Sequence, residues 1–278
     1  MISVTLLCEN TARGRGILGE HGLAFWIDTG THRVLFDTGQ GLTLQANALR
    51  LGIDLATADA IVVSHGHYDH IGGLAQALSM APNAVLHLHP AATAGKFSGS
   101  GGPAPGRRLS LPIMEEETFR TADRRVVADS SPREIVPGVR TTGEIPRCND
   151  FEDTGGPFFL DAALTRPDPI RDDQSLYVST SEGIVLLCGC AHAGVINTLA
   201  HVGRLTGDAP VRLILGGWHL EHASARRLDE TVRALRAQPG PSLGFCHCTG
   251  AAAGRRLWQE FPSRCVPVHA GAQWSFES

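Results

Sequence analysis

Four side chains that can bind a metal ion lie close together in the first half of the chain. They are His65, His67, Asp69 and His70, and the apolar run at 60–63 comes immediately before them. Imidazole nitrogens and carboxylate oxygens are ligands of Zn²⁺, and also of Fe and Mn ions. Burying these groups together without a cation would be costly, because each loses its hydration. The cluster therefore predicts a metal site, and the alternative interpretation is a polar turn rich in histidine.

Three more histidines occupy the same kind of position later in the chain. They are His192, His219 and His247, and each follows an apolar run with glycine nearby. Any one of them alone would more often be an ordinary histidine. Together with the first cluster, they form the pattern that a binuclear metal site requires, so we expect them to converge. The remaining histidines are interpreted as ordinary, with His89 closest to a pocket: His21, His32, His87, His89, His201, His222 and His269.

The segments around these histidines alternate between strand-like and helix-like patterns. Short apolar runs bounded by Asp and Gly predict strands at 4–7, 23–27, 34–36, 60–63, 84–88, 175–179, 184–187, 211–215 and 243–246. Helical spacing predicts helices at 42–51, 71–80, 194–202, 223–237 and 251–261. This alternation favours an α/β fold in which helices cover sheets. The histidines would then lie at strand ends, where such folds bind their ligands.

The segment at about 94–139 differs from the rest. It contains a Gly-, Ser- and Pro-rich stretch at 98–106, followed by a charged, mixed sequence. A long loop in a compact domain is usually a lid or a mobile segment, so we expect a flexible loop or lid here. Neither a linker nor an internal repeat marks a boundary, and we expect a single domain over residues 1–278.

Composition excludes several classes of protein. The chain has 278 residues, 42% of them hydrophobic, which is typical of a folded protein and not of a disordered one. Its net charge of −4 provides no basic excess, so we expect no nucleic-acid partner. The sequence has no apolar run long enough for a transmembrane helix, and it has no secretory signal. We therefore expect no membrane contact. Seven cysteines, an odd number, argue against a disulfide framework and favour the cytoplasm.

The first histidine cluster also resembles a known family signature. The run at 64–73, Ser-His-Gly-His-Tyr-Asp-His-Ile-Gly-Gly, is similar to that of the metallo-β-lactamase fold superfamily. The order of the other motifs is also that of the family, with Phe36-Asp37-Thr38-Gly39 before this run and His192 and His247 after it. Other segments resemble a narrower group, named for 7,8-dihydropterin-6-methyl-4-(β-D-ribofuranosyl)aminobenzene-5′-phosphate synthase: 143–147, 172–176, 189–198, 216–220 and 247–250.

This resemblance implies a four-layer αβ/βα sandwich with metal ions at one rim. It implies a first metal site formed by His65, His67 and His192. A second site would be formed by Asp69, His70 and His247. We expect one or two Zn²⁺ ions there, with Fe or Mn as the alternatives.

The chain departs from the family pattern at one position. Many members provide a bridging Asp from the strand between the last two histidine motifs, but here that strand ends in Gly216-Gly217-Trp218-His219. We interpret His219 as the substitute. Because a neutral imidazole lacks the charge of a carboxylate, we expect the second metal to bind more weakly, or only with substrate.

Several neighbouring residues have a structural interpretation. Asp37 is expected to be a buried acceptor that ties loops near the site together. Asp172 and Asp173 are candidate hydrogen-bond partners of ligand imidazoles. The cysteines next to the later motifs lack the spacing of a tetrahedral zinc site, so we interpret them as small hydrophobic residues beside the metal. They are Cys188, Cys190, Cys246 and Cys248.

Together these features predict a metallohydrolase, or a closely related transferase, that uses metal-activated water. Asp69 would orient or deprotonate the water, and His219 would donate a proton to the substrate or leaving group. The resemblance suggests a small anionic substrate, such as a phosphate ester or a pterin-like compound. The alternatives are an iron-dependent oxidoreductase with the same ligands, and a metal- or metabolite-binding protein with weak catalysis.

Overall fold

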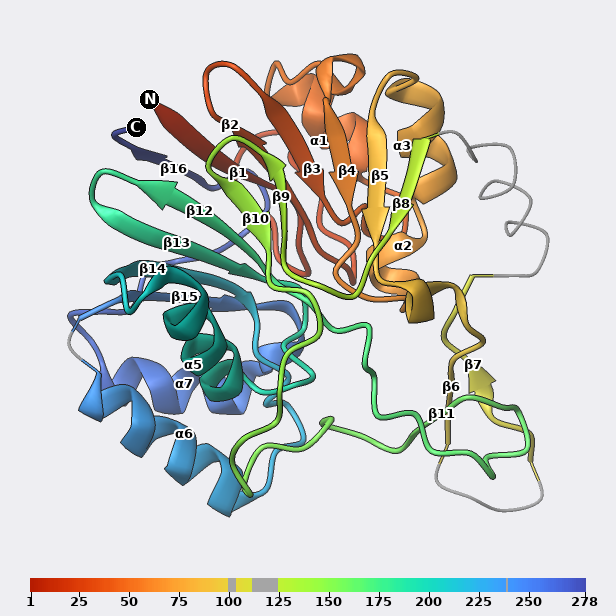
Figure 1. The fold of residues 1–278 in the computed structure, drawn as a ribbon, viewed down its shortest axis with the longest axis vertical. Coiled ribbons are helices and arrows are strands. Elements are labelled where there is room, and N and C mark those ends of the chain that lie inside the picture. Colours follow the sequence, from red (N-terminus) through yellow and green to blue (C-terminus); the bar gives the residue numbers. More distant parts are fainter. Residues whose placement is uncertain (100–103, 112–124, 239) are drawn as a thin grey trace.

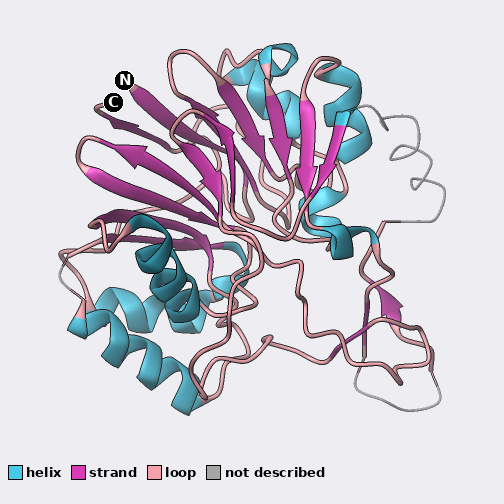
Figure 2. Cartoon of the chain, in the orientation of Figure 1, coloured by secondary structure: helices cyan, strands magenta, loops and turns pink. Residues whose placement is uncertain are grey.

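Two β-sheets pack face to face in the computed structural model, which describes residues 1–99, 104–111, 125–238 and 240–278 (Figures 1 and 2). The first sheet has the strand order β16-β1-β2-β3-β4-β5-β8, and β3, β4, β5 and β8 run parallel. Its strands are β1 (Ile2–Cys8), β2 (Ala24–Asp28), β3 (Arg33–Phe36), β4 (Ala60–Val62), β5 (Val85–Leu88), β8 (Val126–Ala128) and β16 (Gln273–Phe276).

The second sheet has the order β15-β14-β13-β12-β10-β9. In this sheet β13, β14 and β15 are parallel, and the other pairs are antiparallel. Its strands are β9 (Arg133–Val136), β10 (Val139–Thr141), β12 (Leu176–Thr180), β13 (Gly183–Cys188), β14 (Val211–Gly217) and β15 (Ser242–Cys246).

Helices cover the outer face of each sheet. Those of the first half are α1 (Leu44–Arg50), α2 (Tyr68–Ile71) and α3 (Leu74–Met80), and those of the second are α5 (Val195–Thr206), α6 (Ala225–Ala237) and α7 (Ala251–Glu260). Short 3-10 helices are η1 (Leu55–Thr57), η2 (Pro90–Thr93) and η5 (His247–Thr249). Among the described residues, no helix combines the length and the apolar character needed to cross a membrane.

Three buried clusters hold these layers together. One lies between the two sheets and contains Phe25, Val62, Val185 and Leu215. The second joins the first sheet to α1 and α3, and the third joins the second sheet to α5, α6 and α7. Both faces of each sheet are therefore buried, which explains why the central strands are almost continuously apolar. The predicted four-layer αβ/βα sandwich is confirmed.

Segment 94–139 contains more regular structure than expected. Besides β8 and β9, it contributes β6 (Phe97–Ser98) and β7 (Arg107–Arg108), which form a three-stranded sheet with β11 (Phe158–Phe159). Part of the expected loop is therefore strand: β7 and β9 pair with their sequence neighbours β6 and β10, and β6 and β8 pair with the more distant β11 and β5. Residues 100–103 and 112–124 of the segment lie outside the described residues. Figure 1 shows the small sheet beside the main body of the molecule.

Candidate functional site

Asp37 fixes the orientation of the first candidate ligands. It follows β3 with a φ of 62°, a left-handed conformation that is uncommon for a residue with a side chain. Its fully buried carboxylate accepts hydrogen bonds from the amide and hydroxyl of Ser64 and from Nδ1 of His70, each at 2.7 Å. Because a carboxylate can only accept, Nδ1 of His70 carries the proton and Nε2 presents a lone pair. The expectation that Asp37 is a buried acceptor is confirmed.

Ser64 fixes which ring nitrogen of His65 carries the proton. The Ser64 hydroxyl donates to Asp37, so it accepts from Nδ1 of His65, 2.9 Å away, and Nε2 of His65 is left with a lone pair. Gly189 makes the approach of the second sheet possible, because a Cβ there would lie 2.2 Å from the Ser64 hydroxyl oxygen.

The two ligand candidates from the second half of the chain are oriented in the same way. Nδ1 of His192 donates to the carbonyl of Thr154 at 2.8 Å, and Nδ1 of His247 donates to the side-chain oxygen of Asn10 at 2.8 Å. An imidazole with one donated N–H presents its other nitrogen as a metal ligand. His192 and His247 therefore both offer Nε2.

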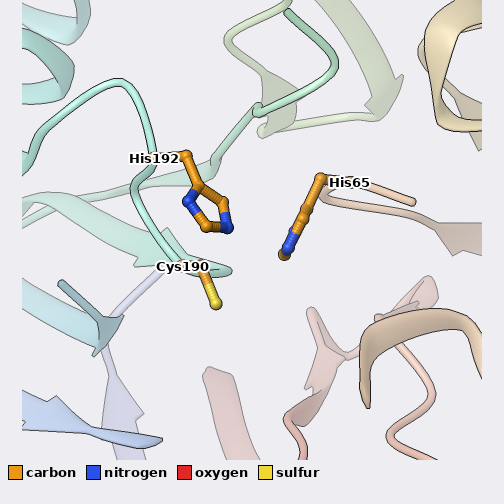
Figure 3. A group of neighbouring side chains, drawn as sticks. All are labelled: His65, Cys190 and His192. Carbon is orange, nitrogen blue, oxygen red and sulfur yellow. The ribbon is translucent and has the colours of Figure 1, made fainter. Parts of the chain in front are cut away.

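These lone pairs converge in two groups. In the first group, Nε2 of His65 lies 2.9 Å from Nδ1 of His67, and the rings of His65 and His192 lie 4.8 Å apart between centroids. Figure 3 shows His65 and His192 facing each other across a gap. Nε2 of His67 and of His192 are buried and have no hydrogen-bond partner among the described residues. Such lone pairs fit a cation, since burying them without a partner is costly.

The second group adjoins the first. Nε2 of His70 lies 3.3 Å from Nε2 of His247, which is also 3.3 Å from a carboxylate oxygen of Asp69. The rings of His65 and His70, with centroids 4.3 Å apart, connect the two groups. The structure thus brings together all six expected ligands in the two expected sets, and their binding of metal stays a prediction.

Burial and charge set the protonation of these groups. Burial lowers the pKa of His65 and His192, and it lowers that of His67 to about 3, so these rings are neutral ligands at pH 7. Burial would also lower the pKa of His247, but its hydrogen bond to Asp69 prevails and raises it to about 9. Without a cation His247 is therefore protonated at pH 7, and its Nε2 would release this proton on binding a metal ion. For Asp69, hydrogen bonds from His21 and His247 outweigh burial and hold its pKa well below the usual range.

His21 belongs to the site, although the sequence interpretation treated it as ordinary. Its Nε2 lies 3.2 Å from the carboxylate of Asp69, and its ring centroid lies 4.9 Å from that of His247. About half of the His21 side chain is exposed, at 52%. The residue lies in the loop between β1 and β2, where neither strand periodicity nor a strand end marks it.

Cys190 lies beside the histidines, as expected. Its Sγ is 3.1 Å from Nε2 of His70 and within 4.8 Å of the ligand nitrogens of His65 and His192, which Figure 3 shows on either side of it. Cys188 and Cys246 do pack as small hydrophobic residues, in the helix-covered cluster and the inter-sheet cluster respectively.

His219 borders a cavity next to these groups. The cavity has a volume of about 260 Å³ and is lined by His21, His67, Tyr68, Asp69, Arg107, Leu109, Phe158, Cys190, His219, Glu221, His222 and Cys248. The ring centroid of His219 lies 4.2 Å from that of His192, and its Nδ1 is buried with no partner among the described residues. Gly155 permits this placement, because a Cβ there would lie 1.9 Å from the His219 ring.

Asp172 and Asp173 support the ligand loops through the backbone, and not through the imidazoles as expected. Asp172 accepts from the amide of Gly66 at 2.7 Å, and Asp173 accepts from the amide of Ala193 at 2.8 Å. His89 does not line the cavity; its Nδ1 instead accepts from the Ala91 amide at the start of η2.

Comparisons with known proteins find similar chains and a similar fold. A protein from Methanocaldococcus jannaschii, 7,8-dihydropterin-6-methyl-4-(beta-D-ribofuranosyl)-aminobenzene-5'-phosphate synthase, is 28% identical over 91% of this chain and 88% of its own. An uncharacterised protein of the same organism, MJ0448, is 30% identical over 92% of this chain and 94% of its own. The crystal structure of Tm1679, described as a metal-dependent hydrolase of the beta-lactamase superfamily, superimposes with a TM-score of 0.83 at 27% identity, with both chains fully covered.

The family comparison covers most of the chain. Residues 18–236 match the model of the metallo-beta-lactamase superfamily. This span contains five of the six candidate ligands, and the sixth, His247, lies at the end of β15 in the same sheet. The chain belongs to the metallo-β-lactamase superfamily.

Proposed function

We propose that this protein is a metal-dependent hydrolase, or a closely related transferase, that acts on a small anionic substrate. The observation that carries the proposal is the convergence of oriented, buried imidazole lone pairs beside a cavity of about 260 Å³. Hydrogen bonds from Nδ1 to oxygen acceptors orient His70, His192 and His247 so that Nε2 points into the site, which is how proteins prepare histidine as a metal ligand.

Zn²⁺ is the proposed metal, held by His65, His67 and His192 and by Asp69, His70 and His247. When bound, such a cation supplies Lewis acidity and lowers the pKa of water, which is the chemistry of hydrolysis at neutral pH. The same nitrogen and oxygen donors also suit Fe and Mn. An iron-dependent oxidoreductase is therefore the second candidate, and a metabolite-binding protein with weak catalysis is the third.

The roles proposed for Asp69 and His219 follow from their positions. Asp69 lines the cavity and accepts from His21 and His247, so its carboxylate is fixed where it can orient the attacking water by a hydrogen bond. His219 reaches the same cavity from the end of β14 and can donate a proton to the leaving group.

The shape and polarity of the cavity support a small anionic substrate. Arg107 lines the cavity, and its guanidinium can bind an anionic group there. The similar synthase from M. jannaschii has a phosphate ester and a pterin in its printed name. A phosphate ester or a pterin-like compound is therefore the substrate class that we propose first.

The small sheet of β6, β7 and β11 is proposed to act as a wall or lid over the cavity. Phe158 of β11 lies 5.2 Å from His67 and 5.9 Å from His219, measured between ring centroids. An aromatic ring at this position can exclude water from the reacting groups.

The seven cysteines support a reducing compartment. All are free, and six of them are buried. We therefore propose the cytoplasm as the place of action.

Elemental analysis of the purified protein tests the proposal, together with a screen of phosphate esters, phosphodiesters, lactones and thioesters. We expect Zn²⁺ in the protein and turnover in at least one class. His67→Ala should abolish the turnover while circular dichroism shows the fold intact. Unchanged turnover in this variant would refute the assignment, and iron with oxygen-dependent turnover would favour the oxidoreductase. A tightly bound metabolite without turnover would favour the binding protein.

A further inference from the structure

We propose that Cys190 is a metal ligand shared by the two histidine groups and that its thiolate replaces the bridging carboxylate of other family members. The inference rests on the proposed metal centre. It changes the expected ligand set and the expected occupancy of the second site, since a thiolate provides the negative charge that His219 lacks.

The position of the sulfur carries the inference. Cys190 is 2% exposed, and its Sγ lies 3.1 Å from Nε2 of His70. It lies within 4.8 Å of the ligand nitrogens of both His65 and His192, and again within 4.8 Å of those of His70 and His247. Of the residues that the structure describes, Cys190 alone contributes to both of these groups. Figure 3 shows its sulfur beside the gap between His65 and His192.

The last two residues of β14, the strand that would carry a bridging Asp in other members, have no room for a side chain. A Cβ on Gly216 would lie 2.0 Å from the carbonyl oxygen of Cys188. A Cβ on Gly217 would lie 2.6 Å from both the carbonyl oxygen of Gly189 and the sulfur of Cys248. The close approach of β14 to the loop after β13 therefore excludes a carboxylate there and brings that loop, with Cys190, towards the histidines.

The backbone holds Cys190 in this place. Gly217 donates its amide to the carbonyl of Gly189 at 3.0 Å, which fastens the loop on one side of the cysteine. On the other side Ala191 has a φ of 50°, a left-handed conformation that turns the chain between Cys190 and His192. The side chains of residues 190 and 192 consequently reach the same group of ligands.

The other cysteines nearby do not fit the role equally well. The sulfur of Cys248 makes a weak contact with the carbonyl oxygen of Cys190 at 3.8 Å. It shares a group with His219 and Cys190 and belongs to neither pair of ligand histidines. Cys188 lies in the apolar cluster under the helices.

Cobalt substitution tests this assignment without depending on activity. Thiolate ligands give Co²⁺ an intense charge-transfer band in the near ultraviolet, whereas nitrogen and oxygen ligands do not. We expect this band in the Co²⁺-loaded protein, its loss in Cys190→Ala, and a fall in bound cobalt from about two ions per chain towards one. Cys190→Asp should lack the band but recover the second ion, because aspartate restores the anionic ligand.

Cys248→Ser is the matched control, since it removes the neighbouring thiol and leaves Cys190 in place. It should keep both the band and the second ion, as should Cys188→Ala. Circular dichroism and thermal unfolding should show that all four variants fold. Loss of the band in Cys248→Ser, or its persistence in Cys190→Ala, would overturn the assignment.

The two proposals fail in different ways. A wild-type protein that takes up no cobalt would contradict the metal centre itself. A wild-type protein that binds cobalt through its histidines without a charge-transfer band would leave the metal centre standing and overturn the role of Cys190 alone.

Discussion

At the scale of single residues, the site depends on acceptors that decide which imidazole nitrogen is free. Asp37, Thr154 and Asn10 each accept a hydrogen bond from the Nδ1–H of one imidazole, which directs its Nε2 at the neighbouring histidines. The sequence motif predicts which histidines are ligands, and Asp37 can be anticipated from its place before the motif. Thr154 and Asn10 cannot, because nothing local connects a loop residue to a histidine that the fold brings next to it.

Asp37→Asn is expected to weaken metal binding about 10- to 100-fold, because His70 loses the carboxylate that fixes its tautomer. Isothermal titration of chelator-treated protein with Zn²⁺ measures the change. Asp208→Asn, in the turn after α5, is the control and should bind as the wild type does. Equal affinity in both variants would show that Asp37 acts only through the fold.

Asp173 provides a test by pH. It is 2% exposed, and burial raises its pKa from 3.8 to about 6. A carboxyl whose pKa is raised on folding binds its proton more tightly in the folded state, so its share of stability is present below pH 3.8 and is lost as pH rises through about 6. Asp173→Asn keeps a side-chain oxygen that can accept from the Ala193 amide, and it removes the loss of stability at high pH. We expect a gain of up to about 3 kcal/mol in unfolding free energy at pH 8 and none at pH 3.5.

Urea unfolding of the Asp173→Asn variant and the wild type at both pH values measures this difference. A gain of the same size at pH 3.5 and pH 8 would mean that the substitution acts by packing and not by ionisation.

At the scale of elements, the strand ends position the ligands, and the side chain of one buried lysine connects the small sheet to them. Lys96, the only lysine in the chain, lies just before β6 with 1% of its surface exposed. Its ammonium donates to Asp168 at 2.9 Å and to Asp172 at 2.7 Å. Asp172 also binds the amide of Gly66, between the first two ligand histidines. This connection links the small sheet to the metal-binding turn.

The elements of this sheet could not be predicted, whereas those of the main sheets could. β3, β4 and β13 are apolar runs whose character is visible in the sequence. In contrast, β6 and β7 are two-residue strands, and they exist because β11, some sixty residues away, provides a partner for β6. The residues next to Lys96 in the sequence do not indicate that it is buried, because the two carboxylates that pair with it belong to residues 168 and 172.

Lys96→Met is expected to destabilise the protein by about 3–5 kcal/mol, because two buried carboxylates lose their counter-charge. The control is Arg133→Met, which removes a half-exposed pair with Asp129 and should cost less than about 1 kcal/mol. Unfolding in urea, followed by tryptophan fluorescence, compares the two. Equal costs would show that the buried ion pairs contribute no more than a surface pair.

At the scale of the whole molecule, the site joins the two halves of the sandwich. His65, His67, Asp69 and His70 follow β4 of the first sheet, whereas His192 and His247 follow β13 and β15 of the second. The inter-sheet cluster, which includes Val62 and Leu187, packs directly behind these strand ends. The order of motifs along the sequence indicates this convergence. The contribution of Cys190 does not emerge until β13 and β14 are seen side by side, because its spacing from Cys188 is not typical of zinc.

A metal held between the two sheets binds the folded chain and not the unfolded one, so removing it should lower the melting temperature. At a free metal concentration of about a thousand times Kd, binding adds about 4 kcal/mol to the unfolding free energy. For a chain of this size, each kcal/mol shifts Tm by about 2–4 °C, so chelation should lower Tm by about 10 °C. Differential scanning calorimetry before and after chelation, and after Zn²⁺ is restored, measures the shift. The double variant His192→Ala/His247→Ala should lose most of the shift because both ligands from the second sheet are removed, and His32→Ala, in the turn between β2 and β3, should keep it. A chelation shift that persists undiminished in the double variant would mean that the metal is held by the first sheet alone and does not join the two halves.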